Sequence, residues 1–64
     1  MNRKMCVRQE ASVRQAMLAI EAGEIGLAFV TTSDDMLLGV VSDGDVRRFL
    51  LRGGTLDASV TNCM

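Results

Sequence analysis

The chain has 64 residues, of which 48% are hydrophobic and only 3% aromatic, and its formal net charge is −1. Seven basic and eight acidic side chains are nearly balanced, which excludes the strongly basic surface typical of nucleic-acid binding. No apolar run approaches the ~18 residues needed to span a bilayer, so we expect no membrane segment. Because so short a chain buries only a small core, its apolar excess predicts that another subunit or domain covers part of its surface.

The reactive side chains are few. Cys6 and Cys63 lie near the two ends of the chain and form no C-x-x-C pair, and there is no histidine. The commonest metal ligand and the commonest general base are therefore missing. We expect no catalytic residues and no metal site, two cysteines that act as small apolar side chains, and a reducing, cytoplasmic environment.

The first helix has clear start and stop signals. A short extended stretch at Met5–Val7 precedes it, and Ser12 and Gln15 have the spacing of a capping box. These signals predict a helix over Ser12–Ala22, followed by Gly23 in the left-handed conformation that ends a helix. Its predicted apolar stripe consists of Val13, Ala16, Met17 and Ile20.

Two apolar runs follow, Gly26–Thr32 and Leu37–Val41, separated by a polar turn at Ser33–Asp35. Runs of this kind around a short connection predict an antiparallel hairpin over Gly26–Val41. Neither run alternates cleanly between polar and apolar residues. We therefore expect both faces of the sheet to be covered, one by helices and the other by something outside this chain.

A second capping-box spacing, Ser42 and Asp45, starts a helix predicted over Asp43–Arg52 and ended by Gly53-Gly54. Its apolar stripe is predicted to be Val46, Phe49 and Leu50, and its polar face Arg47, Arg48 and Arg52. The whole chain, 1–64, is interpreted as one α/β domain. It divides into an N-terminal segment (1–10), a helix-strand-strand-helix core (11–54) and a docking tail (55–64).

The junction between the second predicted strand and the second helix is the most informative segment. Free N–H groups at a helix start attract anions, so Ser42 is a candidate donor to a phosphate and Asp45 a candidate acceptor from a ribose diol. A purely structural explanation is also open, because the same two residues can simply cap their own helix. Local chemistry alone leaves both explanations standing.

The same segment resembles a known family. Gly39, Val40, Val41, Ser42 and Asp45 match the signature of the CBS domain, named after cystathionine β-synthase, and the order of predicted elements agrees. The resemblance implies a small sheet with two helices on one face that pairs with another motif into a Bateman-type module. Because the chain has one motif, it implies a homodimer. It also implies a regulatory ligand such as AMP, ADP, ATP or another nucleotide.

The resemblance assigns site residues as well. It implies that Ser42 and Asp45 contact phosphate and ribose. It further implies that the base pocket is lined by Val7, Gly26, Leu27 and Ala28. Many nucleotide-binding CBS motifs carry a basic residue between the hydroxyl and the Asp, where this chain has Asp43 and Gly44. We expect Arg47 and Arg48, on the next turn, to compensate for that missing cation.

The S-D-G-D-V-R-R form of the segment is similar to CBS domains attached to sugar-phosphate isomerases and sugar-nucleotide nucleotidyltransferases. It implies a regulatory piece, not an enzyme, that works beside an attached catalytic domain. The alternative is a purely structural dimerisation module without a small-molecule ligand. A metal site is disfavoured because the spacing of the acidic residues does not fit an EF-hand loop. Those residues are Asp34, Asp35, Asp43 and Asp45.

Overall fold

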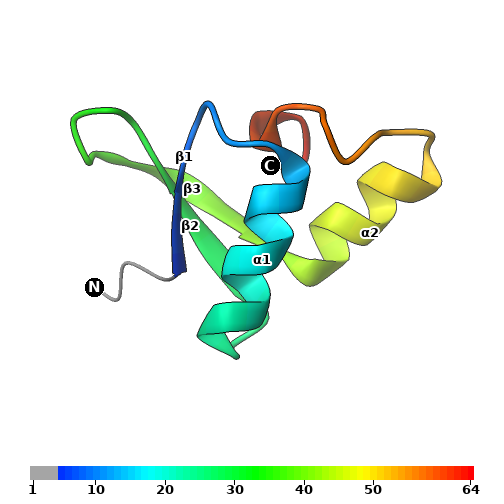
Figure 1. Ribbon diagram of the computed structural model, residues 1–64, viewed down its shortest axis with the longest axis horizontal. Helices are drawn as coiled ribbons and strands as arrows, with labels where there is room; N and C mark the ends of the chain where they lie inside the picture. The colour runs from blue at the N-terminus through cyan, green and yellow to red at the C-terminus, as the bar shows by residue number, and fades with distance from the viewer. Residues whose placement is uncertain (1–4) are drawn as a thin grey trace.

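The structure, a computed structural model, describes residues 5–64. Its elements in chain order are β1 (Cys6–Arg8), α1 (Val13–Gly23), β2 (Leu27–Thr31), β3 (Leu37–Ser42), α2 (Asp43–Leu51) and a 3-10 helix, η2 (Val60–Asn62). In Figure 1 the three strands lie beside α1, and α2 lies on the other side of α1 in that view. This is the predicted small α/β fold, and both helices agree with their expected ranges to within one residue.

The sheet has the order β1-β2-β3. β2 and β3 pair antiparallel, with Ala28 opposite Val41, which confirms the hairpin. β1 pairs parallel with β2, with Val7 opposite Val30. The extended stretch expected at Met5–Val7 is therefore real but shifted by one residue. The sequence carries no signal that β1 pairs with β2. The two strands are parallel and are separated by the whole of α1, so no short turn marks their pairing.

The two faces of the sheet differ in cover. Residues paired across strands share a face, and Val30, Val41 and their neighbour Ala28 are fully buried against the helices. The rest of the core comes from α1, α2 and the tail: Val13, Ala16, Ala19, Ile20, Val46, Val60 and Cys63. On the opposite face Leu38 and Val40 of β3 are 46% and 45% exposed. The prediction that one face lacks a cover within this chain agrees with that exposure.

The end of α1 differs from the prediction. Gly23 stays within the helix, and Glu24 takes the left-handed conformation, with φ of 61°. A Cβ at Gly23 would lie 2.5 Å from the Cγ of Met5, so glycine is needed there for close packing rather than for its backbone freedom. The prediction that Met17 belongs to the buried stripe of this helix is also wrong. Met17 is 38% exposed, and Ala19 is buried in the core instead.

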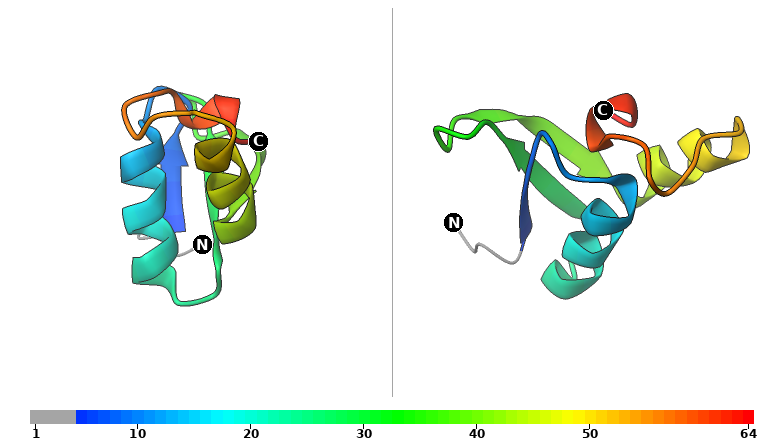
Figure 2. Two further views of the ribbon diagram at one scale, coloured as in Figure 1. Left: turned by 90° about the vertical axis from the view of Figure 1, so that its right-hand side faces the viewer. Right: turned by 45° about the horizontal axis from the view of Figure 1, so that its top comes forward.

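The C-terminal tail returns from the end of α2 to the start of α1, as Figure 2 shows. The Val13 N–H donates to the Ala58 carbonyl at 2.9 Å, and the Arg14 N–H donates to the Leu56 carbonyl at 3.0 Å. Val60 is fully buried in the core. The tail therefore supplies acceptors for the first N–H groups of α1, which have no partner inside the helix itself.

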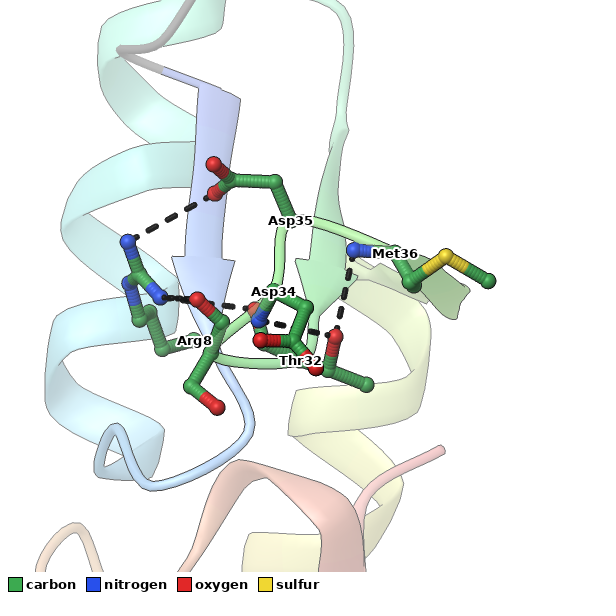
Figure 3. Close-up of polar contacts among 6 residues, drawn as sticks. Arg8, Thr32, Asp34, Asp35 and Met36 are labelled. Atoms are coloured by element: carbon green, nitrogen blue, oxygen red, sulfur yellow. Dashed lines mark hydrogen bonds and ion pairs between the residues drawn. The ribbon is translucent and has the colours of Figure 1, made fainter.

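A single arginine ties the β2–β3 turn to β1 (Figure 3). Arg8 Nη1 donates to the Ser33 carbonyl at 2.7 Å, and Arg8 Nη2 lies 3.5 Å from Asp35 Oδ1. Thr32 Oγ1 accepts from the Met36 N–H at 3.1 Å. The predicted polar turn is confirmed, and Arg8 connects it to the first strand.

Candidate functional site

The junction of β3 and α2 holds the residues of the sequence motif. Ser42 is the last residue of β3 and the N-cap of α2, with φ of −102° and ψ of 165°. The Asp45 N–H donates to Ser42 Oγ at 3.1 Å, and the Ser42 N–H donates to Asp45 Oδ2 at 2.9 Å. The predicted capping box is therefore formed, and it fixes both side chains at the start of the helix.

The Asp45 carboxylate has a second partner on the next turn. Arg48 Nη2 donates to its Oδ1 at 2.9 Å, while the Asp45 side chain stays 33% exposed. The hydrogen bond from the Ser42 backbone lowers the pKa of Asp45, and the Ser42 side chain and Arg48 lower it further. Asp45 is thus held as a carboxylate with acceptor capacity still facing solvent, because each oxygen accepts more than one hydrogen bond.

The two arginines offset the acidic residues of the junction. Arg47 Nη2 lies 3.8 Å from Asp43 Oδ2, and both side chains are about two-thirds exposed. Arg48 folds back over Gly44: a Cβ built on Gly44 would lie 3.2 Å from its Nη1. A guanidinium therefore lies beside Gly44. The compensation expected from Arg47 and Arg48 stays a prediction, with Arg48 beside Gly44 and Arg47 near Asp43.

One backbone donor at this helix start is open. The Asp43 N–H donates to the Gly26 carbonyl at 2.9 Å, and the Asp45 N–H is taken by Ser42. Between them, the Gly44 N–H has no acceptor among residues 5–64. It belongs to the positive end of the helix dipole and to a residue without a side chain. It is therefore a candidate donor to an anion.

The structure brings most of the remaining predicted site residues to the same place. Leu27 pairs with Ser42 across the hairpin and Ala28 follows it in β2, while the Gly26 carbonyl accepts from Asp43. Val7 is not part of this group. It lies on β1, two strands away from β3, and pairs with Val30.

Other chemistry is sparse in the part of the chain that the structure describes. Cys63 is 7% exposed, and burial raises the pKa of its thiol, with the Asp45 carboxylate adding to the effect. Such a thiol is protonated and packs as an apolar side chain. Among residues 5–64 no group of three or more His, Cys, Asp or Glu side chains could hold a metal ion. None of the helices described is long and apolar enough to cross a membrane.

The open Gly44 N–H was missed at the sequence level, although a signal for it exists. Glycine is a poor helix former, so its presence at the second position of a helix indicates a constraint other than helix propensity. The ion pair between Asp45 and Arg48 also has a signal in the sequence, because residues three apart lie next to each other on a helix.

Comparison with known proteins gives the family. Residues 1–52 match the CBS domain family. Over 54 residues the chain is 41% identical to the arabinose 5-phosphate isomerase GutQ of Escherichia coli K12, covering 84% of this chain and 17% of that protein. The corresponding isomerase of Salmonella typhi is 40% identical over 53 residues, 83% of this chain and 16% of that protein. The chain thus spans about a sixth of the curated relatives it matches.

Solved structures agree with this assignment. A CBS-domain protein of Agrobacterium tumefaciens superimposes with a TM-score of 0.83 at 27% identity, covering 94% of this chain and 46% of that one. A CBS domain protein of Pyrobaculum aerophilum complexed with AMP gives a TM-score of 0.82 at 23% identity, covering 92% and 47%. The fold is that of a CBS domain, a small α/β module.

The chain belongs to the CBS-domain family, whose domains are commonly regulatory modules and pair into Bateman modules. Its curated relatives named above are sugar-phosphate isomerases. The sequence resemblance pointed to CBS domains of sugar-phosphate isomerases and of sugar-nucleotide nucleotidyltransferases, and these relatives support the isomerases.

Proposed function

We propose that the chain is a regulatory module that binds an adenine nucleotide and controls an attached catalytic domain. The observation that carries the proposal is the open Gly44 N–H, set between the Ser42 hydroxyl and the Asp45 carboxylate at the strand–helix junction. A fold neighbour is complexed with AMP, which supports AMP, ADP or ATP as the ligand class.

Each residue of the junction has a role in this proposal. The Gly44 N–H and the Ser42 hydroxyl bind the phosphate, and Arg48 and Arg47 supply positive charge beside it. Asp45 accepts from the ribose diol through the acceptor positions that its ion pair with Arg48 leaves free. Gly26 and Leu27 line the base pocket next to the junction, whereas the fully buried Ala28 and Val7, two strands away from β3, do not contribute to it.

The second copy closes this site by covering the open face of the sheet. The strand register places Cys6, Leu27, Phe29 and Val40 on that face. Leu38, two residues before Val40 on β3, is exposed beside them. These side chains are apolar and half-buried or exposed, so association removes them from water. Two junctions then meet at one cleft, and a nucleotide bound there changes how the two copies, and the domains attached to them, are placed.

The attached domain is proposed to be a sugar-phosphate isomerase. The isomerase relatives carry the matching segment as about a sixth of their length. In this arrangement the module contributes no catalytic group. It acts by favouring one relative placement of the catalytic domains when the nucleotide is bound.

A purely structural dimerisation module is the second candidate. It is favoured by one observation: both Asp45 oxygens already have partners within the chain, Ser42 on one side and Arg48 on the other. In that case the junction is only a helix cap, and the apolar sheet face is the whole functional surface.

Calorimetric melting of the chain separates the two candidates. Samples with ~1 mM AMP, ADP, ATP, S-adenosylmethionine or CMP are compared with a nucleotide-free sample. A ligand present at 100 times its Kd raises the free energy of unfolding by about 2.7 kcal/mol, a shift that is large for a domain of this size. A shift with an adenine nucleotide supports the sensor. No shift with any of the five compounds, in a sample shown to be dimeric, overturns it in favour of the structural module.

A further inference from the structure

The guanidinium of Arg48 has two neighbours at the start of α2, one on each of its terminal nitrogens. Its Nη2 donates to Asp45 Oδ1 at 2.9 Å. Its Nη1 lies 3.2 Å from the position that a Cβ on Gly44 would take. The Gly44 N–H has no acceptor among residues 5–64. A charged side-chain donor and an open backbone donor therefore lie at the same residue.

Asp45 holds this guanidinium in place. The Arg48 side chain is 68% exposed, and an exposed arginine without a partner samples many rotamers. The Asp45 carboxylate that accepts from it is itself fixed, because its other oxygen accepts from the Ser42 N–H at 2.9 Å. Arg47 has no comparable support: it lies 3.8 Å from Asp43, whose side chain is 69% exposed. Of the two arginines, Arg48 is the one whose orientation the fold determines.

We propose that Asp45 acts through Arg48 as well as by its own contact with the ligand. It orients the guanidinium so that Nη1 and the Gly44 N–H bind one phosphate group together, and the module thereby selects a phosphorylated nucleoside over the bare nucleoside. This inference rests on the proposed nucleotide function. One bond to Asp45 leaves four guanidinium N–H donors. A charge-assisted bond to phosphate is strong, and a donor that is already oriented loses less freedom on binding.

The proposal reverses the sign of an electrostatic expectation. A carboxylate next to a phosphate dianion repels it, so neutralising either acidic residue of the first turn, Asp43 or Asp45, should by charge alone favour the phosphorylated ligand. If Asp45 orients Arg48, neutralising Asp45 has the opposite result, because the guanidinium is released from its place beside Gly44. Asp43 does not contact Arg48 through any ion pair of the described residues, and its neutralisation keeps the ordinary sign.

Isothermal titration calorimetry of the 64-residue chain with AMP and with adenosine tests this. The measured quantity is the AMP preference, the Kd for adenosine divided by the Kd for AMP, in samples shown to be dimeric. The variants are Arg48→Ala, Asp45→Asn and the double variant. Asp45→Asn keeps a side-chain oxygen that can accept from the Ser42 N–H, and circular dichroism checks the helix content. Asp43→Asn is the matched control, since it removes the same charge from the same turn.

We expect Arg48→Ala to lower the AMP preference about fivefold or more, because a charged donor to the phosphate is lost. Asp45→Asn should lower it as well. The double variant should lose no more than Arg48→Ala alone, because residues that act as a unit are not additive. Asp43→Asn should leave the AMP preference unchanged or raise it.

Three results overturn the orienting role of Asp45 and leave the nucleotide function standing. They are an AMP preference that Asp45→Asn leaves unchanged or raises, losses that add in the double variant, and an equal loss in Asp43→Asn. A parent that binds AMP no better than adenosine overturns the selection of the phosphate group. A dimeric parent that binds neither compound overturns the proposed function, and this inference with it.

Discussion

The two helix N-termini of this domain are almost identical in local geometry, and they differ in what surrounds them. At each, a serine Oγ accepts from the third N–H of the helix at 3.1 Å, and the serine N–H donates to the third side chain at 2.9 Å. At α1 the two preceding N–H groups are taken by carbonyls of the tail. At α2 only the first is taken, by Gly26.

The difference shows that a capping motif by itself does not define a binding site. The α1 cap uses a neutral glutamine and lies under the tail, so it has no donor to offer an anion among the described residues. The α2 cap uses a carboxylate, has two arginines on the following turn and keeps one donor open. The neighbours of the cap therefore decide whether it is a structural end or a candidate site.

The largest expected change in stability comes from loosening the C-terminal tail that covers the start of α1. Val60→Ala removes two buried methyl groups from the tail and should lower the free energy of unfolding by about 2–3 kcal/mol, because it leaves a cavity and loosens the tail over the helix start. Urea unfolding measures this. Leu51→Ala is the control, since Leu51 is 79% exposed and its truncation should cost little. Equal effects of the two variants would contradict the tail's role.

The central comparison is Asp45→Ala against Gln15→Ala. Each removes the third residue of a capping box and should cost about 1 kcal/mol of stability. Only Asp45→Ala should also abolish the nucleotide-induced rise in melting temperature. If Asp45→Ala responds to the nucleotide as the parent does, the proposed site is wrong. A lost response in Gln15→Ala would point to stability rather than to a ligand contact.

A pH titration distinguishes the charged cap from the neutral one. Because hydrogen bonds lower the pKa of Asp45 in the fold, its contribution to stability is present above its unfolded value of ~4 and is lost as the pH falls through the lower folded value. Unfolding followed from about pH 6 to about pH 2 should therefore be flatter for Asp45→Asn than for the parent. Gln15→Glu should introduce a new acid dependence at α1. A parent curve that matches Asp45→Asn would contradict this assignment.

The smallest expected change in stability is that of Gly44→Ala. The new Cβ meets only the exposed end of Arg48, so the free energy of unfolding should change by less than about 0.5 kcal/mol. The added methyl group narrows access to the Gly44 N–H, and the nucleotide response should fall. Gly54→Ala is the contrast: its Cβ would collide with the Phe49 ring and should be clearly destabilising. An unchanged nucleotide response in Gly44→Ala would show that this donor is not used.

The sequence by itself determined the local features of this protein. The capping serines, the polar turn and the 3.6-residue stripes are encoded within a few neighbouring residues, and so the helices and hairpin were predicted to within one residue. The CBS signature at Gly39–Asp45 fixed the family for the same reason. Gly23 was misjudged because its role depends on Met5, which is distant along the chain.

Only the tertiary structure decided which features became core, cover or open surface. It placed β1 parallel to β2 and laid the tail over the start of α1, both through contacts between residues far apart in sequence. It left the Gly44 N–H without an acceptor among the described residues. It also separated Val7 from the other predicted site residues and put Met17 on the outside of α1. Local patterns specify which elements form, whereas their packing specifies which donors and apolar side chains remain available to a ligand or a second chain.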